Sequence, residues 1–351
     1  MRIKKRHITL VISAFLSIAL MYYLYRDFDF RGLFEKMLNI NKYYLAGFIA
    51  VYICTLFIRT YRYWILVGMQ NISFMPVLLT TIVRNMFVDL LPARLGSISY
   101  ILILKKKYNI DYDIGTVSLG LSIFFDIAAM FPLLLMAVIY MLYHVGSSVI
   151  DIDYNIYIII LIFINIAFIT SIILMDRLIT LGKMVIDYLS GLLKLRSYKI
   201  MQIILDFLDR IFGDIIRAKK DKTYYLIFVL SVFLRIFKYI GLYMLLLAIV
   251  FPYGLENFPN LSLFSSFLGT AMTEMSEFLP IKGIAGIGTW HFVWAKTFEF
   301  LKILDFEIAR GAGIMLHSIT QLIEYSSGIL VLLYIISLAK RDGKAGLNEK
   351  G

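Results

Sequence analysis

The sequence has few charged residues, few prolines and almost no cysteine. Only 17% of its 351 residues are charged, against about a quarter in an ordinary soluble protein. The single cysteine, Cys54, cannot form a disulfide within the chain and lies in an apolar stretch, where a small buried hydrophobe is its simplest role. No linker rich in proline and serine divides the chain. We therefore expect one domain over residues 1–351.

Motifs for metal, nucleotide or hydrolytic chemistry are also missing. The four histidines have no cysteine or second histidine at ligand spacing, so we expect no metal site. The sequence contains neither a Gly-x-Ser-x-Gly elbow nor an HExxH motif. The glycines that follow Lys282 lack the Lys-Ser/Thr signature of a nucleotide-binding loop. We therefore expect no cofactor.

Apolar residues fill the chain instead: 60% of it is hydrophobic, and its mean hydropathy is +0.81. Several stretches run for about 20 residues with few or no charges, the length that crosses a bilayer as a helix. They predict an all-α polytopic membrane protein with about six full spans: 8–25, 43–67, 114–142, 154–175, 223–250 and 309–338. The first span is too long for a typical signal peptide, and we expect it to remain uncleaved.

The basic residues behind the net charge of +11 lie mainly between the predicted spans. Basic links face the cytoplasm in membrane proteins, which predicts a plasma-membrane protein with cytoplasmic N- and C-termini and no nucleic-acid partner. The longest basic link, 176–222, alternates apolar and charged residues at helical spacing. That pattern favours a cytoplasmic segment of amphipathic helices, lying on the inner leaflet or packed on the protein itself.

Two apolar segments, 74–104 and 261–300, do not fit as simple spans. Each is broken at Leu-Pro, which occurs nowhere else in the chain, and neither half is long enough to cross alone. The breaks share the pattern acid-x-Leu-Pro-x-base, as DLLPAR at 89–94 and EFLPIK at 277–282. The spans before them share a second pattern: RTYRY at 59–63 matches RIFKY at 235–239.

These matches predict an internal repeat, with repeat one over about 8–142 and repeat two over about 154–338. If each broken segment is a re-entrant helical hairpin, repeat one begins in the cytoplasm and repeat two begins outside. Such an inverted-topology repeat is typical of secondary transporters, where irregular backbone lines a cavity near the bilayer midplane. The residues expected to shape the hairpin backbone are Pro92, Gly96, Pro280, Gly283, Gly286 and Gly288.

Charged residues inside the predicted spans and hairpins form the candidate site, because an ionised group in hydrocarbon is costly unless it faces water or a partner. Bases beside broken helix ends suit an anionic headgroup. The predicted headgroup contacts are Arg59, Arg62, Arg94, Arg235, Lys238 and Lys282. The predicted counter-ions or proton relay are Asp89, Asp126, Glu277 and Glu324. Arg84 and Glu274 belong to the same set without an assigned role. The alternative is that some of these charges only pair to fix helix packing.

At these residues the chain resembles the lysylphosphatidylglycerol synthase transmembrane family, the flippase-like domain also found in multiple peptide resistance factors. NMFVDLLPARLG at 85–96 and LPIKGIAGIGT at 279–289 carry the resemblance, which covers almost the whole chain. It implies two re-entrant helices and the movement of phospholipids or lipid-linked sugars between leaflets. The chain departs from the family pattern at Ser97 and His291, where glutamate is usual. The soluble synthase domain has no counterpart here, so we expect no synthesis of lysyl-lipid.

We therefore predict a lipid translocase, a transporter rather than an enzyme, whose partners are membrane lipids with anionic headgroups. One alternative is a membrane-embedded transferase that acts on a lipid phosphate, with Ser97, His291 and the acids as its available groups. Another is a non-transporting partner subunit of a glycosyltransferase or synthase.

Overall fold

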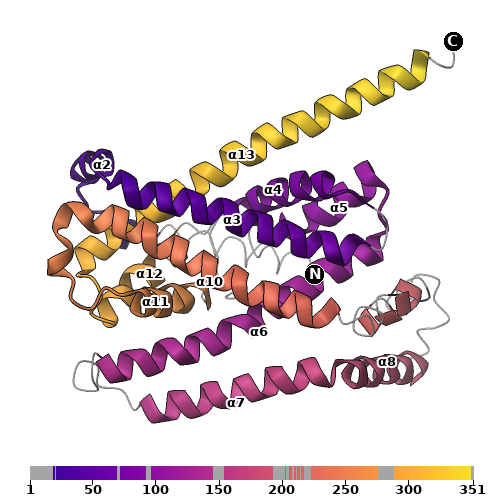
Figure 1. The fold of residues 1–351 in the computed structure, drawn as a ribbon, viewed down its shortest axis with the longest axis horizontal. Helices are drawn as coiled ribbons and strands as arrows, with labels where there is room; N and C mark the ends of the chain where they lie inside the picture. The colour runs from indigo at the N-terminus through magenta and orange to yellow at the C-terminus, as the bar shows by residue number, and fades with distance from the viewer. Residues whose placement is uncertain are drawn as a thin grey trace.

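The computed structural model describes residues 19, 21–68, 72–91, 96–144, 154–192, parts of 202–216, 223–275 and 288–348. Throughout these residues the chain is helical and has no strand (Figure 1). Four described helices are long and apolar enough to cross a membrane: Lys42–Val67, Tyr112–Tyr143, Thr223–Tyr253 and Phe306–Leu338. An all-helical protein with several membrane-length helices is thus confirmed.

The long helices are α3 (Lys42–Val67), α6 (Tyr112–His144), α7 (Tyr154–Ile173), α10 (Thr223–Val250) and α13 (Phe306–Asn348). They begin and end close to the predicted boundaries, except that α13 continues beyond the predicted end at residue 338. The side chain of Asn41 starts α3 by accepting hydrogen bonds from the next free backbone N–H groups. Of the first predicted span, 8–25, the structure describes only residue 19 and residues 21–25, all helical.

The first broken segment forms two short helices, α4 (Phe74–Leu90) and α5 (Ile98–Tyr108), which pack on each other. Val77 near the start of α4 and Leu104 near the end of α5 belong to one apolar cluster, so the chain turns back on itself. Gly96 makes this return possible, because it lies directly against the backbone carbonyl of Phe87. Pro92, at the predicted break, lies outside the described residues.

The second broken segment has the same form, with α11 (Leu263–Met275) and α12 (Thr289–Phe300) packed together. Its two ends meet, since the Asn260 side chain donates a hydrogen bond of 2.9 Å to the carbonyl of Lys302. Gly288 precedes α12 with φ of 98°, a conformation that favours glycine. The predicted turn residues Pro280, Gly283 and Gly286 lie outside the described residues.

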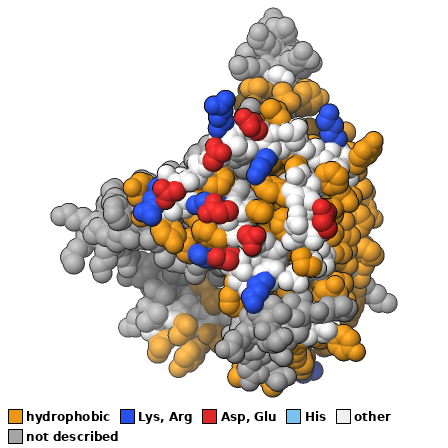
Figure 2. All heavy atoms as spheres, turned by 90° about the vertical axis from the view of Figure 1, so that its left-hand side faces the viewer, with side chains coloured by type: hydrophobic (Ala, Val, Ile, Leu, Met, Phe, Trp, Pro, Cys, Tyr) orange, Lys and Arg blue, Asp and Glu red, His pale blue; other side chains and the backbone are white. Residues whose placement is uncertain are grey.

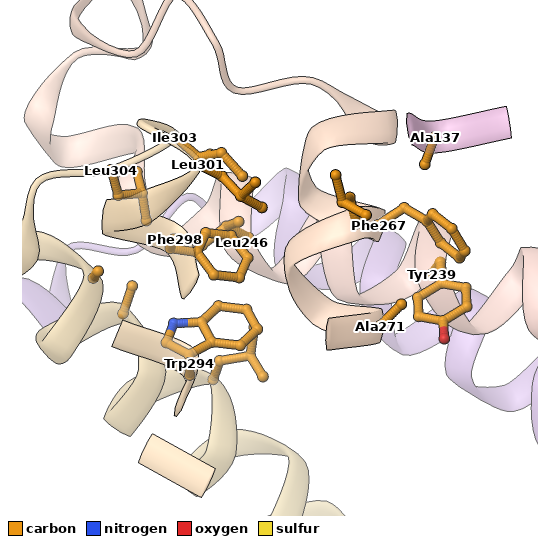
Figure 3. Packing of buried hydrophobic residues seen from close by; sticks show 14 of the residues in the cluster. Ala137, Tyr239, Leu246, Phe267, Ala271, Trp294, Phe298, Leu301, Ile303 and Leu304 are labelled. Carbon is orange, nitrogen blue, oxygen red and sulfur yellow. The ribbon is translucent and has the colours of Figure 1, made fainter. Parts of the chain in front are cut away.

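The antiparallel helices α3 and α10 run through the middle of the bundle. At one end the Asn41 N–H donates to the Ala248 carbonyl at 3.1 Å; at the other, Arg62 contacts Ser231. Each hairpin packs against a long helix from the other half of the chain: α4 packs against α13, and α11 packs against α6. The largest apolar core joins α11 and α12 to α10 and α6 (Figure 3), with Phe267 edge-on to Tyr239 and Trp294 stacked on Phe298.

The outer faces of the long helices are strongly apolar. On α7, Ile159, Phe163 and Ile166 are all exposed, as expected for side chains that face lipid. Figure 2 shows the end of the bundle that carries α2 (Phe30–Leu38) and the short 3₁₀ helices Phe251–Tyr253 and Leu255–Asn257, where acidic and basic side chains intermingle. The molecule therefore has apolar outer faces along its long helices and a polar surface at this end.

At the opposite end, α8 (Met175–Leu192) continues from α7. Its apolar side chains Leu178, Leu181, Val185 and Leu192 are exposed at helical spacing, which gives the helix an uncovered apolar stripe. Within the link 176–222 this helix fits the amphipathic pattern. Its position on the inner leaflet stays a prediction.

Replacing Gly96 with alanine is expected to destabilise the first hairpin by about 1–3 kcal/mol, because the new Cβ overlaps the Phe87 carbonyl oxygen and the backbone must shift. The melting temperature of the purified protein in detergent measures this loss. Gly182→Ala on α8 is the control, since nothing lies within 4 Å of its added Cβ. Equal melting temperatures for the two variants would contradict the close approach at Gly96.

Candidate functional site

A cavity of about 230 Å³ lies among seven helices, α3, α4, α6, α10, α11, α12 and α13. Its lining is strongly charged for a space inside an apolar bundle. The basic lining residues among those described are Arg59, Arg84, Arg235 and Lys238, and the acidic ones are Asp89, Asp126, Glu274 and Glu324. Side chains from both halves of the sequence thus meet in one place.

Glu274 is the centre of the first group of paired charges. Its carboxylate accepts a hydrogen bond of 2.8 Å from the Arg235 guanidinium and also contacts the Lys238 ammonium. The Tyr239 hydroxyl donates to the same carboxylate at 3.2 Å. Arg235 further donates to the backbone carbonyl of Asp126 at 3.0 Å. Because Arg235 and Glu274 are buried, these charge-assisted bonds offset the cost of removing both charges from water.

Arg62 and Asp126 form the second group. The Arg62 guanidinium contacts both carboxylate oxygens of Asp126, one of them at 3.1 Å, and donates to the Ser231 hydroxyl at 2.6 Å. The Arg62 side chain is 0% exposed, whereas that of Asp126 is 25% exposed. Arg62 therefore lies behind Asp126 and, unlike it, does not line the cavity.

A neutral amide holds two more arginines at the cavity wall. The oxygen of the Asn85 side chain accepts a hydrogen bond of 3.0 Å from Arg59 on α3 and one of 3.2 Å from Arg84 on α4. The Arg84 guanidinium also lies 5.8 Å from the centre of the Tyr63 ring, within the range of a cation–π contact. This corner brings two positive charges together.

The last two acids of the lining come from helices that are distant in sequence. Asp89 lies on α4 and Glu324 on α13, helices that pack together, and both side chains line the cavity.

Two histidines extend the polar lining toward α12. His317 lines the cavity, and its ring nitrogens contact His291 at 3.1 Å and Gln321 at 2.7 Å. The Trp290 ring stacks on His317 with their centres 4.9 Å apart. Among the residues that the structure describes, no group of three or more His, Cys, Asp or Glu side chains is arranged to hold a metal ion.

The structure thus brings most of the described candidate residues together. Those that line the cavity are Arg59, Arg235, Lys238, Asp89, Asp126 and Glu324. The predicted site residues Arg94, Lys282 and Glu277 lie outside the described residues. Ser97 and His291, where the chain departs from the family pattern, are both buried.

Glu274 and Asn85 are cavity-lining positions to which sequence reasoning gave no role. Glu274 follows Thr270 by four residues, and Asn85 precedes Asp89 by four, so each pair shares one helix face. All four residues line the cavity. This spacing is the sequence feature by which both positions can be found.

Apolar helices of membrane length around a charged interior define a polytopic integral membrane protein. The family model described as the lysylphosphatidylglycerol synthase TM region matches residues 10–325. Since this match covers most of the chain, the protein belongs to that family, as its sequence motifs predicted. No curated protein matches the chain.

Breaking the pair between Arg62 and Asp126 is expected to destabilise the protein by about 3–5 kcal/mol, because the remaining charge stays buried without its counter-ion. Arg62→Met and Asp126→Leu test this singly and together, through melting temperatures in detergent. The double variant is expected to be less destabilised than the sum of the two single ones.

The exposed pair of Arg26 and Asp27 is the control, since its side chains are 57% and 76% exposed. Arg26→Met is expected to change stability by less than about 1 kcal/mol. Additive effects at Arg62 and Asp126 would show that the two charges do not stabilise each other.

Proposed function

We propose that this chain is a lipid translocase that moves an anionic phospholipid or lipid-linked sugar between the leaflets of the plasma membrane. The observation that carries the proposal is the cavity in which four bases and four acids meet inside an apolar bundle. Such groups are costly inside a membrane unless they serve a polar ligand or pathway. A space of about 230 Å³ suits a headgroup whose acyl chains stay in the surrounding hydrocarbon.

The bases are proposed to exchange their carboxylate partners for the phosphate of the headgroup. Arg235 and Lys238 both face the cavity while contacting Glu274, so an entering phosphate competes with that carboxylate. Arg59 adds a guanidinium whose described hydrogen bond is to a neutral amide, and guanidinium binds phosphate in a bidentate manner. Arg62 acts through Asp126, which it holds in place. Arg94 and Lys282 remain predicted headgroup contacts.

An inverted-topology repeat is part of the proposal. The order α3, α4, α5, α6 recurs as α10, α11, α12, α13, each a long helix, a short pair and a long helix. The packing is reciprocal, since α4 contacts α13 and α11 contacts α6. The antiparallel course of α3 and α10 is what inversion of one half requires.

The two hairpins are proposed to be re-entrant from opposite sides. The ends of the second hairpin meet at Asn260 and Lys302, at the end of the bundle that carries α2. The first hairpin ends at the three lysines 105–107 in the last turn of α5, at the other end. We assign the lysine-rich end to the cytoplasm, together with both termini, by the positive-inside rule.

A transport role is favoured over the transferase alternative by the position of Ser97. This hydroxyl is buried and does not line the cavity, so it is not presented to a lipid phosphate bound among the bases.

Replacing Arg235 with glutamine is expected to slow the exchange of fluorescent phosphatidylglycerol between leaflets of proteoliposomes by roughly tenfold or more. A hydrogen bond to a charged group contributes about 1.5–3 kcal/mol, and the variant lacks the proposed bond between the Arg235 guanidinium and the headgroup. The measurement is the rate at which the label becomes accessible to a membrane-impermeant quencher.

The control is Arg31→Gln on α2, because the Arg31 side chain is 92% exposed; it is expected to exchange lipid at the wild-type rate. Circular dichroism and gel filtration of each variant separate loss of function from loss of fold. Wild-type exchange no faster than in protein-free vesicles would refute the translocase, and an unchanged rate in a folded Arg235→Gln would refute the headgroup site.

A further inference from the structure

Two histidines and a glutamine form a hydrogen-bonded chain at the wall of the cavity. The Nδ1 atom of His317 lies 3.1 Å from Nε2 of His291, and the Nε2 atom of His317 lies 2.7 Å from the amide nitrogen of Gln321. An amide nitrogen can only donate, so Nε2 of His317 accepts. The one N–H of neutral His317 is therefore on Nδ1, which donates it to Nε2 of His291.

This chain can take up one further proton, and only at His317. A half-turn of the Gln321 amide presents its oxygen to Nε2 of His317, which can then carry a proton and donate it while Nδ1 keeps its bond to His291. A proton on Nε2 of His291 would instead face the Nδ1–H of His317 and break their contact. His291 is also buried, and its Nδ1 has no hydrogen-bond partner among the described residues, so a charge there would be poorly stabilised.

The surroundings of His317 suit an imidazolium that acts on the cavity. Its ring stacks on that of Trp290, with their centres 4.9 Å apart, and the face of an indole ring attracts cations. His291 supplies an acceptor that carries no charge, whereas a carboxylate in its place would cancel the charge of the imidazolium. His317 lines the cavity. A proton on His317 therefore adds one positive charge to the cavity wall.

Charged groups of both signs face the same space as His317. Those on α13 and on the helices that pack against it are Arg84 and Asp89 on α4, Arg235 and Lys238 on α10, His291 on α12 and Glu324 on α13. Further helices contribute Tyr52 and Arg59 from α3, Asp126 from α6 and Glu274 from α11. Histidine is the side chain whose ordinary pKa lies between about 5 and 8, so His317 is the group in this set to test first.

We propose that His317 is a further anion-binding residue, which attracts the headgroup as an imidazolium, and that His291 and Gln321 are its positioning residues. This inference rests on the proposed translocase function and adds one residue to the same site. A proton from solvent binds Nε2 of His317, and no other covalent bond changes. Because linkage is reciprocal, headgroup binding takes up a proton, and acid pH strengthens headgroup binding. The added affinity is present when His317 is charged and is lost as pH rises.

The experiment measures how tightly the full chain in detergent binds fluorescent phosphatidylglycerol across the range of about pH 5 to pH 8. The phosphate of this lipid is a diester and keeps one negative charge throughout. We expect the affinity at the acid end to exceed that at the alkaline end by about tenfold, the lower limit for a hydrogen bond to a charged group. Between these limits binding is expected to take up part of one proton, measured as a pH change in weakly buffered solution.

Variants of the two histidines test the assignment. His317→Gln removes the charge, so at every pH it is expected to bind with the affinity of alkaline wild type and to take up no proton. His291→Gln keeps a neutral acceptor and is expected to keep the pH dependence. His291→Glu holds a proton on His317 and cancels its charge, so it is expected to lose the pH dependence. The control, His144→Gln at the end of α6, is expected to match wild type.

Several outcomes would overturn the inference. Equal wild-type affinity across the pH range does so, while lipid exchange in proteoliposomes leaves the translocase standing. Proton uptake that persists in folded His317→Gln shows that another group binds the proton. If His317→Gln does not fold, the two His291 variants decide, because opposite results are expected of them. Absence of lipid binding at every pH also overturns the inference, and absence of exchange as well refutes the translocase, so the two failures are distinguishable.

Discussion

The mutual neutralisation of charges inside an apolar bundle is the constraint on which the rest of this structure depends. A lone ion in hydrocarbon costs several kcal/mol, and that cost falls only when a counter-charge comes within hydrogen-bonding distance. Glu274 brings α11 to α10 through Arg235, and Asp126 brings α6 to α3 through Arg62. Apolar contacts allow a membrane helix many rotations about its axis, whereas these ion pairs form in only one of those rotations. They therefore fix the register of the bundle.

The cavity is lined by both long and short helices. The long helices α3, α6, α10 and α13 contribute charged side chains, and the short helices α4, α11 and α12 complete the lining. Because each hairpin packs on a long helix of the other half, the cavity belongs to neither half alone. Its shape thus depends on how the halves sit against each other.

Much of this architecture could be predicted from the sequence, because membrane helices can be recognised by the length and apolar composition of their segments. Apart from the end of α13, the long helices begin and end close to the expected residues, and the segments broken at Leu91-Pro92 and Leu279-Pro280 each contain two helices. The candidate charges could also be recognised, since an ion in an apolar run has few structural roles. Six of the predicted site residues line one cavity.

Which charges meet could not be predicted, because pairing depends on the rotation of helices that are distant in sequence. Arg59 and Arg62 are three residues apart, yet only Arg59 reaches the cavity while Arg62 is enclosed behind Asp126. Glu274 belongs to the set of charges inside apolar segments, but its pairing with Arg235 depends on the rotation of α11. Asp89 and Glu324 come from opposite halves of the chain and line the same cavity, which no local pattern of the sequence indicates.

The corner at Asn85 has a consequence for affinity. One amide oxygen keeps the guanidinium groups of Arg59 and Arg84 side by side, although like charges repel and long side chains gain entropy when they are free. These two side chains are therefore already ordered in the folded protein. In the proposed translocase, a headgroup phosphate bound between these two guanidinium groups would relieve the repulsion without having to immobilise either side chain, which is the benefit of preorganisation. The ordering imposed by Asn85 would then strengthen the binding of a ligand that Asn85 need not contact.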